Sequence, residues 1–481
     1  MPINSFLYPG ASGPVVYEVA NSLRFEDGNS DTLSRTPSSS GNRKTWTWSG
    51  WIKRSELGRT QNFFSAGTNN QNYGRIQFNS NDNIYIAHVD SASTTTEKQT
   101  TQVFRDVSSW YHIVWHIDTT QSTASNREKL YVNGAQITDF STNTIPAEDY
   151  QSTINEDVAH YIGTQLASYE KCSCYFAEVV FIDGQALTPS SFGEFDEDSP
   201  TIWKPKNVSG LTFGTNGFYL EFEQSGTSQN SSGLGADTSG NDNHFAVSNL
   251  TAIDQSTDTC TNNFCTLNPL VNVPYSTYSE GNTFVDVTST GNSSHHTNYG
   301  TIAFDSGKWY WEAKALGGSK YTIGLSDAEN QSNYQQVAGT NLIVGNQANS
   351  YVSGDAIGWY STTLYKNGST IASSLSEIVT NDIMMVAVDA DNGKIYFGKN
   401  GTWRVANSTT FDSAQHDTTF TTGEFYVSAF SNEDCDWSVN WGSPSHSVSS
   451  GNADANSHGN FEYAVPSGYF ALCTKNLAEF G

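Results

Sequence analysis

The chain has few of the features that cross-link proteins or anchor them in membranes. It contains 6 cysteines and 3 methionines among 481 residues. Cysteine this sparse excludes a fold that depends on disulfides. No apolar run approaches the roughly 20 residues that a membrane-spanning helix needs, and the opening MPINSFLYPGASG lacks the basic and apolar parts of a secretory signal peptide. We therefore expect a protein that is made in the cytoplasm and is not inserted in a membrane.

Basic residues are also scarce. The chain has 23 Lys and Arg against 49 Asp and Glu, which gives a formal net charge of −26. Such a surface repels nucleic acid phosphates and anionic lipid headgroups, so neither is expected as a partner. The same charge favours solubility, in ordinary buffer and at high salt, where ions screen the self-repulsion.

Long apolar patterns with the helical period are absent, as is a heptad repeat that could form a coiled-coil stalk. Aromatic residues are abundant instead, with 12 Trp, 24 Tyr and 26 Phe. Short alternating segments bounded by Gly, Asn, Ser and Thr predict β-strands. Because one hydrophobic core serves roughly 250–300 residues, the sequence predicts an all-β protein of two or three domains.

One pattern occurs twice, in residues 110–134 and 383–401. Each copy has an apolar run that ends at an aspartate (Asp118 or Asp389), then a turn, a Lys-x-Tyr segment and an Asn-Gly pair. The alternation predicts a hairpin with one buried face, and Asn-Gly supplies the two positive-φ residues of a type I′ turn. The aspartates could orient a ligand, but they more simply cap the turns.

The chain divides into four parts. Residues 1–20 form an irregular lead, 21–205 a first sandwich, 206–282 a bridging segment with a few strands, and 283–481 a second sandwich. The predicted fold class is all-β, with two antiparallel β-sandwich domains of jelly-roll type joined by an irregular linker. Proline and serine in residues 187–195 predict one short helical turn.

Several motifs of the first domain occur together in the laminin-G-like, concanavalin A-like jelly roll. They are SGWIKR (49–54), FFSAG (63–67), WYHIVWHID (110–118), KLYVNG (129–134) and YFAEVVFIDG (175–184). As a set, these motifs resemble that family, which implies an antiparallel sandwich whose loops carry any binding residues.

The second domain resembles a SPRY domain. The matching motifs are GKWYWEAK (307–314), YTIGLSD (321–327), GDAIGWY (354–360) and VAVDADNGKIYFGKNG (386–401). The pair of domains is similar to structural proteins of marine tailed bacteriophages that occur as fibre or appendage components. This resemblance implies a virion protein with two sandwiches that bind carbohydrate or protein.

The resemblance further implies a non-enzymatic tail-fibre or appendage adhesin. Its partners would be a host cell-surface glycan or receptor and other virion proteins. One alternative is a capsid decoration or tail-assembly protein that binds neighbouring virion subunits, and another is a polysaccharide depolymerase. Such appendages are often homo-oligomers, commonly trimers, although no pattern in the chain encodes a three-fold axis.

Two groups of residues could support chemistry but suit structural roles better. Glu194, Asp196 and Asp198 come close to the E-x-D-x-E signature of jelly-roll glucanases, which hold two carboxylates about 5.5 Å apart. Their neighbours do not alternate, so we expect a solvated acidic loop and no catalytic residue. His295 and His296 are adjacent and would point to opposite faces of a strand, which disfavours a shared metal site.

Asp237, Asn241 and Asp242 are the candidate ion ligands. Oxygen-bearing side chains around a glycine can ligate Ca²⁺. The segment lacks the order and the final glutamate of a complete calcium loop, and it also suits an Asx-rich turn without an ion. No motif requires a cofactor, and calcium is the ion that the chain could hold.

Exposed aromatic rings could stack on the C–H groups of a sugar. Most tryptophans lie in alternating strands and are expected in the core. The aromatic residues expected in loops are the candidate carbohydrate-binding residues: Tyr73, Tyr169, Tyr334 and Trp403.

Overall fold

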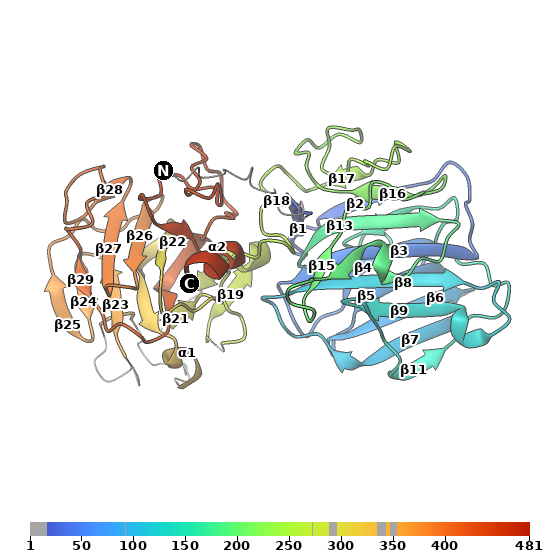
Figure 1. Ribbon diagram of the computed structural model, residues 1–481, viewed down its shortest axis with the longest axis horizontal. Helices are drawn as coiled ribbons and strands as arrows, with labels where there is room; N and C mark the ends of the chain where they lie inside the picture. Colours follow the sequence, from blue (N-terminus) through green and yellow to red (C-terminus); the bar gives the residue numbers. More distant parts are fainter. Residues whose placement is uncertain (1–16, 92, 272, 288–295, 334–342, 347–353) are drawn as a thin grey trace, which may run out of the picture.

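The computed structural model describes residues 17–91, 93–271, 273–287, 296–333, 343–346 and 354–481. Two β bodies lie side by side along the longest axis of the molecule (Figure 1). In the described ranges, α-helix is confined to α1 (Glu329–Asn333) and α2 (Thr474–Phe480). The predicted fold class, all-β with two sandwich domains, is confirmed.

The first body consists of two eight-stranded antiparallel sheets. Sheet 1 has the order β10-β9-β8-β3-β13-β1-β18, with β16 paired to β13. Its strands are β1 (Ser22–Phe25), β3 (Thr45–Arg54), β8 (Trp110–Asp118), β9 (Glu128–Val132), β10 (Ala135–Gln136), β13 (Cys174–Asp183), β16 (Phe218–Leu220) and β18 (Gln255–Ser256).

Sheet 2 has the order β11-β7-β6-β5-β4-β12-β2-β17. Its strands are β2 (Thr32–Arg35), β4 (Gln61–Asn69), β5 (Asn72–Phe78), β6 (Asn83–Asp90), β7 (Ser93–Val103), β11 (Phe140–Thr144), β12 (His160–Ile162) and β17 (Ala246–Ser248). A separate small sheet pairs β14 (Gly193–Phe195) with β15 (Trp203–Pro205). The predicted helical turn is the 3₁₀ turn η2 (Pro189–Ser191), and a second 3₁₀ turn is η1 (Ala124–Asn126).

Large aromatic side chains fill the core between sheets 1 and 2. On β3, Trp46 and Trp48 are fully buried in this core, while Thr47 and Ser49 point to the opposite face of the sheet. The rings of Trp46 and Trp115 meet edge to face with centroids 4.6 Å apart. Each such ring buries roughly 150–250 Å², which at about 25 cal/mol per Å² contributes about 4–6 kcal/mol before entropy is counted.

The second body is a thirteen-stranded sheet, sheet 3, which contains the path β19-β20-β30-β22-β23-β24-β25. Its strands are β19 (Ser276–Ser279), β20 (Phe284–Val287), β21 (His296–Tyr299), β22 (Lys308–Asp327), β23 (Ala356–Tyr360), β24 (Thr363–Lys366), β25 (Ser369–Ala372), β26 (Ile383–Asp389), β27 (Lys394–Lys399), β28 (Thr402–Trp403), β29 (Thr418–Thr419), β30 (Tyr426–Asn440) and β31 (Phe470–Ala471). The long strands β22 and β30 form its centre, and 3₁₀ turn η3 (Glu280–Asn282) links β19 to β20.

The two Asn-Gly turns have the predicted backbone. Asn133 and Gly134 have φ values of 48° and 80°, and Asn400 and Gly401 have φ values of 50° and 81°. Positive φ at both central residues defines the type I′ turn, whose twist matches that of the flanking strands. The first turn joins β9 to β10 and the second joins β27 to β28.

The two aspartates of the repeated pattern cap turns. The Asp118 carboxylate accepts a hydrogen bond from the Thr120 backbone N–H at 3.2 Å and from the Gln121 amide at 2.6 Å. The Asp389 carboxylate accepts one from the Asn392 backbone N–H at 3.1 Å. These contacts are the structural role expected of an aspartate at a strand end.

The strands that lie within the predicted bridge 206–282 belong to the sandwiches themselves. β16 and β18 lie in sheet 1, β17 lies in sheet 2, and β19 lies in sheet 3. The polypeptide that crosses between the bodies is therefore the shorter segment 257–275. The sequence of the predicted bridge 206–282 does not reveal the pairing partners of these strands, because each strand is only two to four residues long.

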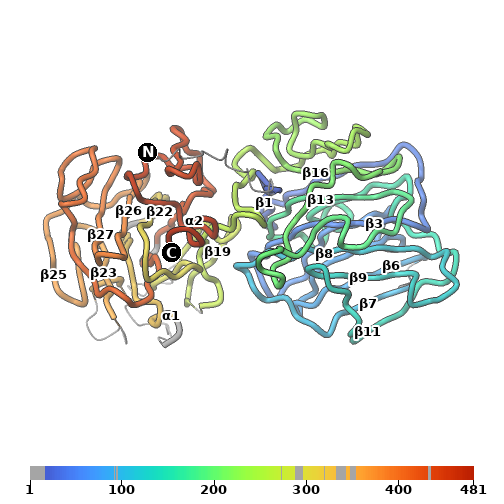
Figure 2. The backbone as a smooth tube through the Cα atoms, in the orientation of Figure 1, coloured from blue at the N-terminus to red at the C-terminus, as the bar shows by residue number. Residues whose placement is uncertain are grey.

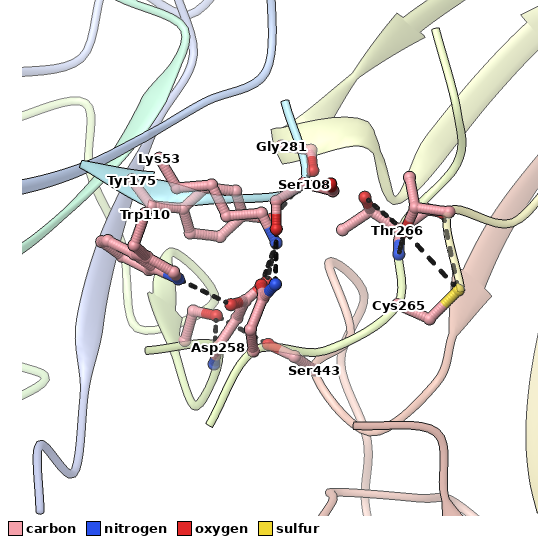
Figure 3. Close-up of polar contacts among 12 residues, drawn as sticks. Lys53, Ser108, Trp110, Tyr175, Asp258, Cys265, Thr266, Gly281 and Ser443 are labelled. Carbon is pink, nitrogen blue, oxygen red and sulfur yellow. Dashed lines mark hydrogen bonds and ion pairs between the residues drawn. The ribbon is translucent and has the colours of Figure 1, made fainter. Parts of the chain in front are cut away.

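The two bodies meet at a buried polar seam (Figure 3). Lys53 Nζ of β3 lies 2.7 Å from Asp258 Oδ2, and each side chain is only 1% exposed. The indole N–H of Trp110 donates to the other Asp258 oxygen at 3.3 Å, and the Tyr175 hydroxyl donates to the Gly281 carbonyl at 3.0 Å. Asp258 lies in the crossing segment and Gly281 lies beside sheet 3, so the seam anchors both of them to sheet 1.

The remaining features of the fold concern the cysteines and the length of the helices. Cys172 and Cys174 form a disulfide, which the sequence did not predict, and Cys260, Cys265 and Cys473 are free thiols. No helix in the described ranges is long and apolar enough to cross a membrane.

Candidate functional site

Sheets 1 and 2 differ in what covers their outer faces. Phe192, Val208 and Phe213 pack over Val114 and Val180 on the outer face of sheet 1. Near the middle of sheet 2, the outer face instead carries half-buried polar and aromatic side chains. A sandwich face that remains open in this way is a candidate binding surface.

The open face is built from alternate residues of neighbouring strands. On β5, Ile76 points into the core, whereas Tyr73 and Arg75 point outward. The Arg75 guanidinium lies over the Tyr73 ring at 5.2 Å and over the Tyr85 ring of β6 at 5.6 Å. The Tyr85 hydroxyl donates to Glu97 Oε2 of β7 at 2.7 Å. These cation–π contacts hold a planar cation between two rings.

A loop covers one side of this cluster. The Arg75 guanidinium donates to the Gln165 side-chain oxygen and to the Glu170 carboxylate. Gln165 and Tyr169 exchange backbone hydrogen bonds at 2.8 and 2.9 Å, which closes a tight turn. The Tyr169 side chain ends up 57% exposed beside the cluster. We call the set Tyr73, Arg75, Tyr85, Glu97, Gln165, Tyr169 and Glu170 the tyrosine–arginine face.

The backbone of this loop is unusual. Leu166, Ala167 and Glu170 have φ values of 49°, 67° and 51°, in the left-handed region that non-glycine residues seldom adopt. Such conformations cost of order 1 kcal/mol or more each and persist only where the surroundings hold them. Here the Ser65 hydroxyl donates to the Thr164 carbonyl at 3.0 Å and ties the loop to β4. A strained loop held over an open face suits a preformed binding site.

The Tyr85 phenol is protonated at neutral pH. Burial raises the pKa of Tyr85 to about 12, and the hydrogen bond to Glu97 acts in the same direction. The Tyr85 hydroxyl therefore stays protonated and remains a hydrogen-bond donor. The face thus offers aromatic rings, a phenol donor and carboxylate acceptors, which are the groups that contact sugar C–H and hydroxyl groups.

The structure brings together two of the four predicted carbohydrate-binding residues. Tyr73 lies against Arg75, and Tyr169 adjoins Glu170, which binds the same arginine. Trp403 is a correction, because it lies in β28, is only 4% exposed and packs edge to face on Phe411. A ring buried in this way has no face for a sugar. Tyr334 lies outside the described residues.

The predicted calcium ligands do not converge. Both carboxylate oxygens of Asp237 accept hydrogen bonds from backbone N–H groups and the Ser239 hydroxyl at 2.8–2.9 Å. The Asn241 amide donates to backbone carbonyls, and the Asp242 side chain is 90% exposed. The segment forms the Asx-rich turn that the sequence analysis gives as the alternative to a calcium site, and the three candidate ligands do not meet. Among the described residues, no group of three or more His, Cys, Asp or Glu could hold a metal ion.

The glucanase-like carboxylates also lie where solvent reaches them. Glu194 is exposed on β14. Asp196 Oδ1 accepts hydrogen bonds from the backbone N–H groups of Asp198 and Ser199 at 3.0 and 2.9 Å, and Asp196 Oδ2 binds Lys204 Nζ at 3.1 Å. This is the solvated acidic loop expected from the sequence. His296 is buried on β21, and His295 lies outside the described residues.

The sequence interpretation missed Arg75, Tyr85, Gln165 and Glu170. A signal existed in RIQFN and NIYIAHV, because period-two alternation places Arg75 and Tyr85 on the outer face of their strands. The register that sets Tyr85 opposite Gln77, two residues from Arg75, depends on strand pairing and is not encoded locally. Gln165 and Glu170 reach the face only through the turn of their loop.

A sandwich whose outer face carries a cluster of polar and aromatic side chains has the features of a binding protein. Residues 27–191 match the family model of the Concanavalin A-like lectin/glucanases superfamily, and residues 308–442 match the SPRY domain model. The chain thus carries a laminin-G-like, concanavalin A-like domain followed by a SPRY domain, as the sequence motifs predict. Domains of these two kinds indicate a role in binding or adhesion.

Solved structures show distant likeness. The SPRY domain of human HERC1 is 16% identical, with a TM-score of 0.25 over 36% of this chain and 96% of that one. The SAP-like pentraxin of Limulus polyphemus is 18% identical, with a TM-score of 0.28 over 36% and 80%. Domains LG4-5 of the mouse laminin alpha1 chain are 11% identical, with a TM-score of 0.29 over 89% and 90%. These scores are too low to bear on function. No curated protein sequence matches the chain.

Proposed function

We propose that this protein is a non-enzymatic component of a bacteriophage virion that binds host-surface carbohydrate through the tyrosine–arginine face. The observation that carries the proposal is the open cluster of Tyr73, Arg75, Tyr85 and Tyr169 on the concanavalin A-like sandwich. The virion location rests on the resemblance of the domain pair to phage appendage proteins. Several copies in a homo-oligomer, such as a trimer, would add avidity to shallow single sites.

The binding step follows from the groups on the face. A pyranose ring packs its C–H groups against Tyr73 and Tyr169, while its hydroxyls bond to Arg75, Gln165 and Glu170. The site is shallow and offers only two rings, so single-site affinity is modest. A neutral or weakly charged glycan suits a protein with a net charge of −26, because an anionic polymer would be repelled.

The first test is binding of purified protein to immobilised host polysaccharide. We expect Tyr73→Ala together with Tyr169→Ala to weaken binding about tenfold or more, or ~1.4 kcal/mol. The control is Phe425→Ala in the second body, whose ring is 57% exposed, as is that of Tyr169. Equal losses in both variants, or no binding by the unaltered protein, would refute the assignment of the face.

Location on the particle is tested separately. Immunogold labelling or cryo-EM of particles should find the protein at the tail tip or on an appendage. Labelling spread over the capsid shell would support the alternative of a capsid decoration protein. A reducing-sugar assay on host glycan should stay at background, and product formation that Glu194→Ala abolishes would establish a depolymerase.

A further inference from the structure

A cavity of about 570 Å³ lies between the two bodies. One wall consists of Glu26 and Asp27 after β1 and of the loop at Glu56 and Arg59. The other wall consists of β19 and the segment around Leu270. The volume falls within the roughly 300–1,000 Å³ of ligand sites, which often form at domain interfaces. Since both bodies line it, neither domain has this cleft alone.

The walls of the interdomain cleft are held in place. The Glu280 backbone N–H at the end of β19 donates to Glu26 Oε2 at 2.8 Å. The fully buried Arg24 lies 3.4 Å from the Glu280 carboxylate and 3.6 Å from that of Asp254. β1 and β19 lie on either side of the junction in the tube view (Figure 2). A cleft with fixed walls requires little ordering when a ligand binds.

One wall of the cleft is a sheet edge. β19 is the terminal strand on the path of sheet 3 and pairs with β20 on one side. No strand of the described ranges pairs with its other side. All four residues of β19, Ser276–Ser279, line the cavity. An unpaired strand edge presents backbone N–H and C=O groups that an extended peptide can join as a further strand.

On the opposite wall of the cleft, the Arg59 side chain pairs with two carboxylates. Arg59 Nη1 lies 2.6 Å from Asp27 Oδ2 and 3.1 Å from Glu56 Oε1. The Arg59 side chain is 55% exposed, whereas that of Asp27 is only 18% exposed. Because the Arg59 guanidinium is largely solvated, its pairs with Asp27 and Glu56 contribute about 1 kcal/mol or less. An incoming cation could therefore replace Arg59 at little cost, and the carboxylates would keep a partner throughout.

We propose that the interdomain cleft binds an extended peptide segment that adds to the free edge of β19 and places an arginine or lysine side chain on Asp27 and Glu56 in place of Arg59. The exposed Leu270 and the Tyr278 ring offer apolar contacts to neighbouring side chains of the segment. The net charge of −26 attracts a basic segment over distance. This site is separate from the tyrosine–arginine face and does not depend on carbohydrate binding.

The test uses the whole chain and a fluorescent peptide of about six residues, the usual length of a strand. The peptide alternates threonine and valine and carries one central arginine. Fluorescence anisotropy gives its affinity. We expect Glu56→Gln to weaken binding about tenfold and Arg59→Ala to strengthen it, because the competing guanidinium is gone. A purely structural role of Arg59 predicts no such gain.

Control variants and control peptides test whether binding depends on the carboxylates of the cleft and on backbone hydrogen bonds. Glu148→Gln and Lys44→Ala alter exposed ion pairs, Arg127–Glu148 and Lys44–Asp149, and should leave affinity unchanged. A peptide with glutamate in place of arginine, or with N-methylated backbone amides, should bind at least about tenfold more weakly. Equal binding of the glutamate peptide, absence of binding to the unaltered protein, or full competition by free arginine would overturn the proposal.

Discussion

Buried charges at the seam are the positions where single residues matter most. Lys53 and Asp258 are each 1% exposed and pair at 2.7 Å, and Lys53 Nζ also donates to the Asn263 side-chain oxygen at 2.6 Å. Removing charges from water is costly, and the pair is tolerated only because each charge is bonded. Lys53 occupies an outward position of β3, where a lysine is normally solvated, and Asp258 and Asn263 of the crossing segment bind its ammonium group there.

The substitution Asp258→Asn leaves the Lys53 charge buried without its counter-ion. We expect it to lower the free energy of unfolding by about 3–5 kcal/mol, measured by urea denaturation. Asp149→Asn serves as the control, because Asp149 also pairs with a lysine, at 3.0 Å, but its side chain is 66% exposed. That variant should change stability by about 0–1 kcal/mol. Similar effects for the two variants would contradict the role assigned to the seam.

At the scale of elements, a turn glycine is constrained both by its own backbone conformation and by the residues packed against it. Gly134 has a φ of 80° in the β9–β10 turn, and a Cβ built there would lie 2.5 Å from the Trp203 ring of β15. Gly184, after β13, has a similar φ of 90°, yet a Cβ there meets no atom within 4 Å. The two positions share the backbone requirement and differ only in the space around them.

Alanine substitutions at Gly184 and Gly134 therefore separate the cost of a left-handed backbone from the cost of steric crowding. Gly184→Ala should cost about 1–2 kcal/mol from the left-handed backbone alone. Gly134→Ala should cost about 1–3 kcal/mol more, because the new methyl group must displace Trp203. Thermal unfolding of the two variants gives the difference. Equal melting temperatures would show that Trp203 moves aside freely.

Elements were predictable where the information is local. Alternation on β3 and the Asn-Gly pairs predicted strands, faces and turn type, because each depends on neighbouring residues. The sequence alone places β16, β17 and β18 in a bridge, because strands of two or three residues acquire their role only from distant partners. The same holds for the tyrosine–arginine face: the sequence predicts Tyr73 and Tyr169 as candidates, whereas Arg75 and Glu170 reach the face only through strand register and a folded loop. Trp403 is predicted to be an accessible loop residue, but Phe411, which follows it in the chain, packs on its ring and buries it.

At the scale of the whole molecule, the docking of two acidic bodies confines carboxyl groups. Glu26 is 8% exposed beside the seam, where it accepts hydrogen bonds from Ser173 Oγ at 3.1 Å and from the Glu280 N–H at 2.8 Å. Burial, reinforced by the nearby Asp27 carboxyl, raises the pKa of Glu26 to about 7. The folded protein therefore holds a proton on Glu26 that the unfolded chain releases at lower pH.

The sign of the resulting pH dependence follows from proton linkage. Where the folded state binds more protons than the unfolded state, the free energy of unfolding falls as pH rises. For Glu26 this window runs from about 4.5, its ordinary pKa, to about 7, with a slope of up to about 1.4 kcal/mol per pH unit. Buried histidines titrate in part of the same range with the opposite sign, since burial lowers the pKa of His112 to about 3 and that of His160 to about 4. A comparison of variants with the unaltered protein cancels the histidine contribution.

Glu26→Gln replaces the titrating carboxyl by a neutral group of the same shape. We expect this variant to gain stability relative to the unaltered protein as pH rises from about 5 to about 8, measured by urea denaturation at several pH values. Asp118→Asn is the control. Burial opposes ionisation of Asp118, but hydrogen bonds from Thr120 and Gln121 outweigh it and lower its pKa. The carboxylate is therefore ionised throughout this range, and the control difference should be flat. A flat difference for Glu26→Gln as well would mean that the seam admits enough water to keep Glu26 ionised, and that the two bodies dock less tightly than the contacts of Glu26 and Glu280 imply.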